Sequence, residues 1–507
     1  MVNQANWQRI LDQGIHAIKQ QHGEQALVLL RAAYRMAPGE RDVSYWLGNA
    51  LRICGQPKEA ESRFRELIKQ NPHDAESSFA LAFLFRAEGR PEHAAELLLL
   101  LAKMRSQDLE LLLEISGFLR ECNQFEAAIN VLAMATTLAP QDDSLYFKRA
   151  QLLKAVGQFE NALDQLRVCL KMNPANGGAW LSLAQLQSFS GSQQEDWQLI
   201  EQASTQMMGD EVDMCVAFAF GKALDDVENW ASAWTQYTKG NLLRHAMQPW
   251  SRTGWNRQVQ LSLQNSEIEK PGSVQARRNA VYIVGMLRSG TTLLEQLLDR
   301  HSQICGRGEL NFLSHMARDP TRISTLSPPE LEQLGNELWT QMRLEGPNCH
   351  HYIDKNPLNF RFIASLLQVL PEARIIHMTR DGRDSCLSCY FQLFQHPDAG
   401  FSYQLDDLVD YYKTYRQIMR RWTDVLGDRM LTVAYENLVR DPENELKRVV
   451  DFLGLQWEEE MQLMAEQPRP VRTASTWQAR QPIYQRSRAR WKNYNALARG
   501  FFDAIVE

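Results

Sequence analysis

The chain has 507 residues, enough for two or more domains, and its 44% hydrophobic and 23% charged residues are ordinary for a folded protein. A formal net charge of −6 gives no general footprint for nucleic acid. The N-terminal residues lack the basic segment and apolar run of a signal peptide, and apolar runs such as 97–102 are too short to span a bilayer.

Cysteine usage indicates the compartment. Eight cysteines in a chain of this length do not form a disulfide framework, and a reducing cytoplasm fits them. Cys386 and Cys389 make a lone CxxC without a second pair or a neighbouring ligand cluster. We therefore expect these two cysteines to pack along a helix, and we expect a cytoplasmic protein.

The first half of the chain repeats with a period of 34 residues. Four columns step by 34: prolines at Pro38, Pro72, Pro140 and Pro174; small residues at Gly48, Ala82, Ser116, Ala150 and Ala184; a second small column at Ala26, Ala60, Ala94, Ala128 and Ala162; and turn residues at Gly55, Gly89, Asn123, Gly157 and Gly191. Small residues suit closely crossing helices, Gly or Asn ends the first helix of a unit, and Pro ends the second. Period and pattern resemble the tetratricopeptide repeat.

The repeats run from about residue 5 to residue 200, and 216–244 reads as one more degenerate unit. We predict an all-α solenoid over 1–262 and a linker over 263–279, which is polar and contains Pro271 and Gly272. The groove of such a solenoid suits an extended peptide or a partner helix. The alternative is that the groove only docks the second domain or dimerises the chain, and the oligomeric state stays open.

After the linker, short β-branched runs alternate with helical segments. The runs "AVYIV", "ARIIHM" and "MLTVAY" each precede a loop and a helix-like stretch. This alternation predicts an α/β domain over 280–507, with a parallel sheet covered by helices on both faces. Ligands then bind at the carboxyl ends of the strands.

The first of these loops, "GMLRSGTT", is built like a phosphate cradle. Gly285 and Gly290 have P-loop spacing, but Thr291 stands where an NTPase needs Lys, and no Walker-B Asp is evident. Arg288 supplies a cation inside the loop instead. Further hydroxyls come from Ser289, Thr291 and Thr292. The missing Lys disfavours a nucleotide kinase or NTPase, which stays a minor alternative that would bind ATP with Mg²⁺.

The stretch "RSGTTLLEQLLDRHSQI", followed by "TRDGRDSCLSCYF", resembles the sulfotransferases that use 3'-phosphoadenosine-5'-phosphosulfate (PAPS). The resemblance covers about 280–494 and is strongest to the tyrosylprotein type and its bacterial relatives fused to tetratricopeptide repeats. It implies that the P-loop-like segment binds the 5'-phosphosulfate. It also implies that Arg380 and Ser388, eight positions apart, bind the 3'-phosphate.

The same resemblance implies roles for further residues. They are Arg288 on the phosphosulfate, Glu309 as the base, Lys355 on the transferring group, Tyr435 against the nucleotide, and Ser475 or Thr476 with Arg490 closing over the donor. The Glu309 loop differs from the family by about one residue in register. Arg490 stands where the tyrosylprotein type has Lys, which keeps the charge but changes the geometry. His315 is the alternative base, because small-molecule sulfotransferases use a histidine.

Sulfuryl transfer resembles phosphoryl transfer, in which fixed cations stabilise negative charge on the moving group. Arg288, Lys355 and the loop N–H groups would do so here, while Glu309 takes the acceptor's proton. With two cations in place, no metal is required. Each of these residues also has an interpretation without a catalytic role. Glu309 could cap a helix, Lys355 and Asp354 could form a surface pair, and "RDGRD" could be a charged turn without a ligand.

The predicted function is transfer of the sulfuryl group of PAPS to a hydroxyl, most plausibly a tyrosine of a peptide or protein held by the repeats, with 3'-phosphoadenosine-5'-phosphate as product. One alternative acceptor is a saccharide, lipid or small-molecule hydroxyl. A second alternative is a repeat scaffold whose sulfotransferase-like domain is inactive.

Overall fold

The structure is a computed structural model that describes residues 2–264, 279–310, 313, 323, 325–343, 349–394, 396–462 and 488–506. The chain divides into two compact units, Met1–Val156 and Gly157–Glu507. The predicted linker lies almost wholly outside the described residues. The division between the two units, after Val156, falls inside the repeats. The predicted boundary between the repeats and the α/β domain therefore stays a prediction.

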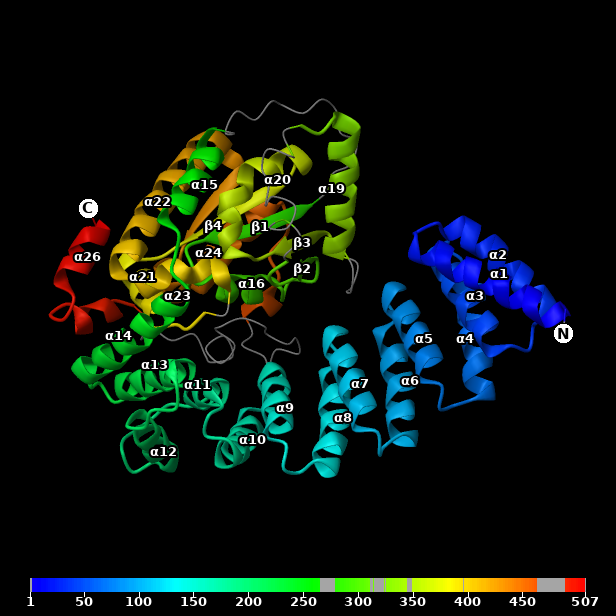
Figure 1. Cartoon of the computed structure of the whole chain (residues 1–507). Helices are drawn as coiled ribbons and strands as arrows, with labels where there is room; N and C mark the ends of the chain where they lie inside the picture. The colour runs from blue at the N-terminus through cyan, green and yellow to red at the C-terminus, as the bar shows by residue number, and fades with distance from the viewer. Residues whose placement is uncertain are drawn as a thin grey trace. The chain divides into compact units, whose positions relative to one another are not determined.

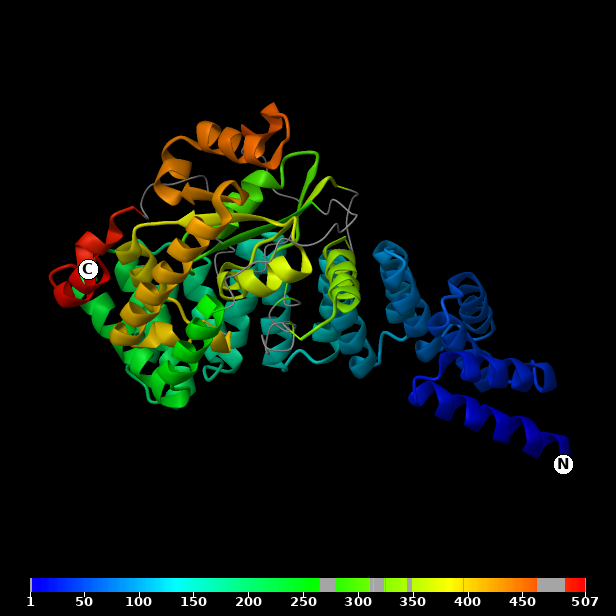
Figure 2. The same cartoon turned by 90° about the horizontal axis from the view of Figure 1, so that it is seen from above.

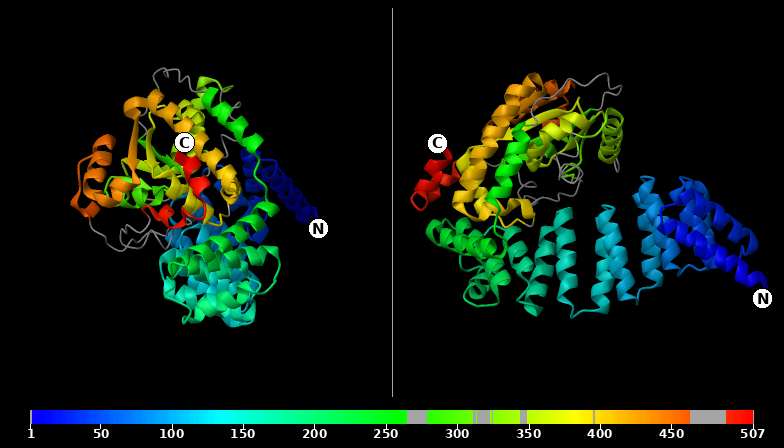
Figure 3. Two further views of the ribbon diagram at one scale, coloured as in Figure 1. Left: turned by 90° about the vertical axis from the view of Figure 1, so that its left-hand side faces the viewer. Right: turned by 45° about the horizontal axis from the view of Figure 1, so that its top comes forward.

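The first unit is a row of helices, seen side by side in Figures 1 and 3. Its helices are α1 (Val2–Lys19), α2 (Gly23–Met36), α3 (Arg41–Ile53), α4 (Pro57–Gln70), α5 (Ala75–Ala87), α6 (Pro91–Met104), α7 (Leu109–Glu121), α8 (Phe125–Leu138) and α9 (Asp143–Val156). The first helices of successive repeats begin at residues 41, 75, 109 and 143. This spacing of 34 confirms the repeat and its period.

The small and turn columns have the physical roles expected of them. A Cβ on Gly48 would lie 2.7 Å from the ring of Phe64, so the crossing of α3 and α4 leaves no room for a side chain. Gly55, Gly89 and Asn123 all have positive φ, between 60° and 70°. These residues end the first helix of each unit in the left-handed conformation that Gly and Asn tolerate best.

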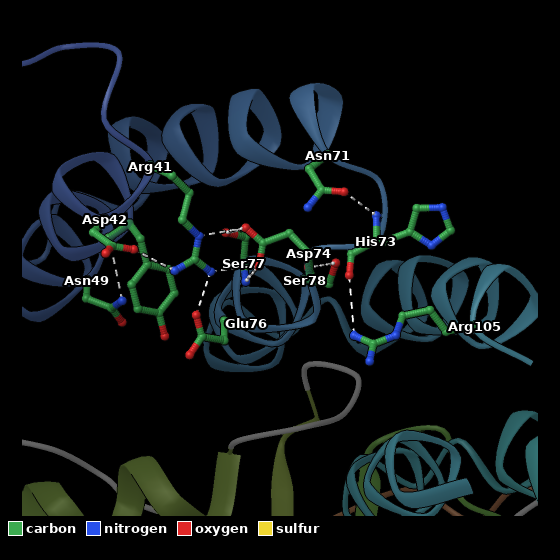
Figure 4. Close-up of polar contacts among 11 residues, drawn as sticks. Arg41, Asp42, Asn49, Asn71, His73, Asp74, Glu76, Ser77, Ser78 and Arg105 are labelled. Atoms are coloured by element: carbon green, nitrogen blue, oxygen red, sulfur yellow. Dashed lines mark hydrogen bonds and ion pairs between the residues drawn. The ribbon is translucent and has the colours of Figure 1, made fainter. Parts of the chain in front are cut away.

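Polar contacts join one repeat to the next, as Figure 4 shows. Arg41 of α3 donates to both carboxylate oxygens of Asp74, at 3.0 and 2.8 Å, and forms an ion pair of 2.6 Å with Glu76. Asp74 also caps α5 by accepting from the backbone N–H of Ser77 at 3.1 Å. Burial by itself would raise the pKa of Asp74. The hydrogen bonds from Arg41 and Ser77 lower this pKa by more than burial raises it, so it lies below its ordinary value.

The second unit begins with further helices that follow α9 in the chain. They are α10 (Phe159–Met172), α11 (Gly177–Gln185), α12 (Glu195–Ser204), α13 (Asp210–Asp226), α14 (Trp230–Met247) and α15 (Arg252–Gln264). The degenerate unit predicted over 216–244 forms the pair α13 and α14. The side-chain amide of Asn241 in α14 donates to the backbone oxygen of Tyr390 at 2.9 Å, so these helices are fastened to the α/β part.

The centre of the second unit is a five-stranded parallel sheet. Its strands are β1 (Ala280–Gly285), β2 (Ile304–Gly306), β3 (His351–Asp354), β4 (Arg374–Thr379) and β5 (Met430–Ala434), in the order β2-β3-β1-β4-β5. The sequence predicted β1, β4 and β5. It missed β2 and β3, because runs of three and four residues are too short to show a period.

Helices lie on both faces of the sheet (Figures 1 and 2). The helices and 3-10 turns of this part are α16 (Thr291–Leu298), α19 (Pro328–Arg343), η1 (Pro357–Phe362), α20 (Ile363–Val369), α21 (Gly382–Tyr390), η2 (Pro397–Tyr403), α22 (Leu405–Leu426), η3 (Gly427–Arg429), α23 (Tyr435–Arg440), α24 (Pro442–Leu453), η4 (Glu459–Gln462), η5 (Arg490–Tyr494) and α26 (Arg499–Val506). Val281 and Ile283 of β1 belong to one apolar core with α16, α23 and α24. On the opposite face, the hydroxyl of Tyr282 contacts the sulfur of Met342 in α19.

One disulfide is present, although the cysteine count gave no sign of a disulfide framework. Cys305 in β2 is bonded to Cys349, which precedes β3, and the two lie 44 residues apart in sequence. The other six cysteines form no disulfide. Cys386 and Cys389 are buried in α21, as predicted. A single bridge has no spacing signature, so only the fold could reveal it.

Candidate active site

Each of the five strands is followed, within three residues, by a residue that the sequence assigned to the site. They are Arg288 after β1, Glu309 after β2, Lys355 after β3, Arg380 after β4 and Tyr435 after β5. Because all five strands are parallel, their carboxyl ends meet at one edge of the sheet. Topology therefore gathers residues that are spread over about a third of the chain.

Two glycines let the loop after β1 pack tightly. A Cβ on Gly285 would collide with the backbone oxygen of Met378 in β4. Gly290 has a φ of +102°, and a Cβ there would lie 2.6 Å from the ring of Tyr435. Neither position can carry a side chain without a shift of its neighbours. The P-loop spacing therefore has a structural cause in this fold.

Arg288 lies at the centre of a cluster of predicted donor-binding residues. Its φ is +66°, which costs a non-glycine residue about 1 kcal/mol or more. Its Nε donates to the hydroxyl of Ser388 at 3.0 Å, and the guanidinium of Arg380 donates to its backbone oxygen at 2.9 Å. The guanidinium carbon of Arg380 lies 4.8 Å from the ring centre of Tyr435. The structure thus brings Arg288, Ser388, Arg380 and Tyr435 together.

Hydroxyls line the start of α16. Ser289 is buried, and its Oγ has no hydrogen-bond partner among the residues that the structure describes. Thr291 is buried, Thr292 is half-buried, and both belong to the first turn of α16. The first N–H groups of a helix lack intrahelical partners and carry positive potential. Together with the orphan hydroxyl, they suit an anionic group.

Glu309 and Lys355 form an ion pair. The Nζ of Lys355 lies 2.6 Å from Oε1 of Glu309. The side chain of Lys355 has no exposed surface, whereas that of Glu309 is 45% exposed. Asp354 is also buried, at 1% exposure, so the reading of Lys355 and Asp354 as a surface pair is wrong. The exposed carboxylate of Glu309 is the accessible end of this pair.

Two buried carboxylates beside this pair were not found from the sequence. Glu295 of α16 accepts from the backbone N–H of Gly308 at 2.6 Å, and Asp354 accepts from that of Leu310 at 3.2 Å. Burial raises the pKa of Glu295 to about 7 and that of Asp354 to about 8, while the charge of Lys355 opposes both shifts. A glutamate on the apolar face of the helix was the only sequence signal for Glu295.

In the "RDGRD" turn, one acid orients one arginine. Asp381 accepts from the guanidinium of Arg383 at 3.0 and 2.7 Å. Asp384 instead accepts from the backbone N–H groups of Ala489 and Trp491, at 2.6 and 3.0 Å. The turn therefore leaves Arg380 to the loop after β1 and anchors the C-terminal segment to α21.

Arg490 pairs with a residue that the sequence did not suggest. Its guanidinium forms a short ion pair with Asp225 of α13, and it lies 5.2 Å from the ring centre of Phe391. Its closing over a donor stays a prediction. Ser475, Thr476 and the alternative base His315 lie outside the described residues.

Two features are absent from the part of the chain that the structure describes. Within the described ranges, no cluster of three or more His, Cys, Asp or Glu residues is arranged to hold a metal ion. In the same ranges, no helix is both long and apolar enough to cross a membrane. That catalysis requires no metal stays a prediction.

The sequence matches models of two kinds of protein family. Residues 280–459 match the model of the sulfotransferase family, and residues 17–84 and 143–176 match models of tetratricopeptide repeats. Over residues 280–459 the chain is therefore similar to the sulfotransferase family, and this part follows the segments that match tetratricopeptide repeats.

Individual relatives are similar at low identity. An uncharacterized protein of Aquifex aeolicus (strain VF5) is 29% identical over 254 residues, 45% of this chain and 32% of that protein. The protein-tyrosine sulfotransferase of Drosophila melanogaster is 27% identical over 201 residues, 35% of this chain and 38% of that protein. Omega-hydroxy-beta-dihydromenaquinone-9 sulfotransferase Stf3 of Mycobacterium bovis (strain ATCC BAA-935 / AF2122/97) is 27% identical over 249 residues, 34% of this chain and 62% of that protein. This chain thus spans 32% to 62% of the length of these relatives.

Proposed function

We propose that this protein transfers the sulfuryl group of PAPS to the hydroxyl of a tyrosine in a peptide or protein. The observation that carries the proposal is the convergence of Arg288, Glu309, Lys355, Arg380 and Tyr435 at the carboxyl edge of one parallel sheet. The match of residues 280–459 to the sulfotransferase family supports the reaction class.

The residues present fit a donor with two separate anionic ends. The orphan hydroxyl of Ser289 and the first turn of α16 would receive the 5'-phosphosulfate, with Arg288 beside it. Arg380 and Ser388, both in contact with Arg288, would receive the 3'-phosphate. Tyr435 offers a ring for the nucleotide. When bound, PAPS supplies the sulfuryl group and a bisphosphate leaving group.

The two residues of the ion pair, Glu309 and Lys355, have different roles in the proposed reaction. Glu309 would take the proton from the acceptor hydroxyl. A bond then forms between the acceptor oxygen and sulfur, while the bond from sulfur to the 5'-phosphate oxygen breaks and its electron pair leaves with 3'-phosphoadenosine-5'-phosphate. Lys355 and Arg288 would stabilise the negative charge that develops during this exchange.

The tyrosine acceptor is supported by the relatives and by the repeats. The Drosophila relative is named a protein-tyrosine sulfotransferase. In the first unit, a cavity of about 360 Å³ lies between α3, α5 and α7 and is lined by Tyr45, Asn49, Arg52, Glu76, Phe79 and Phe83, among others. Such a cavity supports binding of a peptide or protein by the repeats.

A second acceptor class is favoured by one observation. The mycobacterial relative is named for a hydroxylated menaquinone substrate, which is a lipid-like alcohol rather than a peptide. A small-molecule hydroxyl is therefore the alternative acceptor. The donor-binding residues are the same in both cases, so only acceptor assays separate the two.

The test has a donor part and an acceptor part. Calorimetry with 3'-phosphoadenosine-5'-phosphate should show binding that Arg288→Ala and Arg380→Ala each weaken at least about tenfold, since each loses a charge-assisted contact. Arg420→Ala, at an exposed site on α22, is the matched control. Radiolabelled PAPS should then label tyrosine peptides. Absence of bisphosphate binding would refute the donor, and label found only on lipid-like alcohols would replace the acceptor.

A further inference from the structure

The segment 306–310, which carries Glu309, is held by side-chain carboxylates. Three of them accept hydrogen bonds from alternate backbone N–H groups of the segment: Asp299 from Gly306 at 2.6 Å, Glu295 from Gly308 at 2.6 Å, and Asp354 from Leu310 at 3.2 Å. The backbone is therefore anchored on both sides of Glu309.

Glu295 and Asp299 act where the sheet ends. β2 is the edge strand of the described sheet, with β3 as its neighbour, and the N–H of Arg307 donates to the backbone oxygen of Ile353 at 2.9 Å. The N–H groups of Gly306 and Gly308 alternate with that of Arg307 and face away from β3. The carboxylate of Glu295 on α16 and that of Asp299, directly after α16, thus take the place of a missing strand, which satisfies groups that are costly to leave unpaired.

Glu295 links this segment to the donor loop. It lies on α16, which starts at Thr291 directly after the glycine loop, and it sits about one turn further along. A Cβ on Gly306 would lie 3.1 Å from both Cγ and Oε1 of Glu295, so the segment approaches the helix as closely as it can. One short helix therefore contacts both the predicted donor site and the base segment.

We propose that Glu295 is a positioning residue: by holding Gly308 it sets the carboxylate of Glu309 against Lys355 and ties the base segment to the donor-binding helix. The inference rests on the proposed function, in which Glu309 takes the acceptor's proton. A displacement of about 1 Å at a reacting group, caused by a distant substitution, can lower a rate by about 100-fold.

The structural half of the test does not depend on activity. In Glu295→Ala the N–H of Gly308 loses its acceptor, and hydrogen exchange of the 306–310 amides should speed up at least about tenfold. Glu295→Gln keeps an oxygen at the same place and should restore most of the protection. Glu445→Gln on α24 replaces a carboxylate of the same 8% exposure that pairs with Arg448, and exchange in 306–310 should stay unchanged. Equal exchange rates in Glu295→Ala and wild type would overturn the proposal.

The kinetic half separates positioning from general loss of structure. Glu295→Ala should lower kcat by about 100-fold while the dissociation constant of 3'-phosphoadenosine-5'-phosphate changes less than about threefold. Glu295→Gln should recover most of kcat. A parallel loss of bisphosphate binding would mean that Glu295 supports the donor loop instead, which also overturns the proposal.

The failure of the proposed function would look different. In that case the wild-type chain itself would lack bisphosphate binding and transfer, whereas the exchange measurement would still decide whether Glu295 holds the segment. If Glu295→Ala does not fold, Glu295→Asp withdraws the carboxylate by one methylene group and supplies the same comparison.

Discussion

The ammonium group of Lys355 has no exposed surface and lies 2.6 Å from the carboxylate of Glu309, which is 45% exposed. A buried lysine is costly unless it is paired. The fold supplies that pairing with Glu309. The arrangement presents the carboxylate of Glu309 to solvent and keeps the ammonium group of Lys355 behind it. The proposed group transfer requires a base and a charge stabiliser, which are these two groups.

Replacing Lys355 by methionine should abolish this stabilisation without emptying the donor site. We expect kcat to fall by about 100- to 1,000-fold, as for other single charge-stabilising groups, with binding of 3'-phosphoadenosine-5'-phosphate little changed. Steady-state kinetics and calorimetry check both halves. Lys69→Met, at an exposed site on α4, is the control, and a variant of Lys355 with wild-type kcat would remove this residue from the mechanism.

The buried acid Glu295 should make stability fall as pH rises. Its pKa is raised by burial to about 7 from an ordinary value of 4.5, so between these values the folded chain binds a proton that the unfolded chain has released. The free energy of unfolding then decreases with pH, by at most about 1.4 kcal/mol per pH unit for this group. The charged groups acting on Glu295 are Lys355, Asp299, Glu309 and Asp354.

A difference measurement isolates this effect. His351 and His377, whose pKa values are lowered to about 4 by burial, change stability in the opposite direction below about pH 6.5. Urea unfolding of wild type and Glu295→Gln at a series of pH values cancels their contribution. The variant should gain stability relative to wild type between pH 5 and 7 and show no further gain above that range. A constant difference would show that Glu295 does not titrate there.

Gly290 should not tolerate alanine. Its φ of +102° is strained for any L side chain, and the added Cβ would lie 2.6 Å from the ring of Tyr435. We expect Gly290→Ala to weaken bisphosphate binding at least about tenfold, because the loop and Tyr435 must both shift. Gly454→Ala is the matched control: it also has positive φ, at +74°, but its added Cβ meets nothing closer than 3.9 Å. Calorimetry should show normal binding for this control.

The bridge between Cys305 and Cys349 should leave six free thiols in the purified chain and eight after reduction. Chain entropy for a loop of this length predicts that Cys349→Ser lowers the free energy of unfolding by about 2–4 kcal/mol. Thiol titration and urea unfolding measure these two quantities. The thiols can also be blocked chemically inside the cells, before the protein is purified. Eight free thiols in protein treated in this way would support the cytoplasmic location expected from the sequence, since disulfides persist in oxidising compartments.

Local patterns in the sequence were enough to predict the architecture. The 34-residue period specified helix pairs because each column answers a local need, such as the close crossing at Gly48 and the left-handed turn at Gly55. Strand–loop–helix alternation predicted a parallel sheet with its ligand edge at Arg288 and Arg380. The resemblance to sulfotransferases supplied Glu309 and Lys355, which the structure places in contact.

Only the tertiary structure could decide which groups meet across long stretches of chain. The pairing of Arg490 with Asp225, the bridge between Cys305 and Cys349, and the contact of Glu295 with Gly308 join residues between 13 and 265 positions apart. No periodicity encodes such contacts, because they depend on which strand lies at the edge and which face of a helix turns inward. The sequence by itself determined the repeats, three of the five strands and the chemistry of the loops. The packing of α16 against β2 decided how the base is held, because an edge strand needs partners for its outward N–H groups.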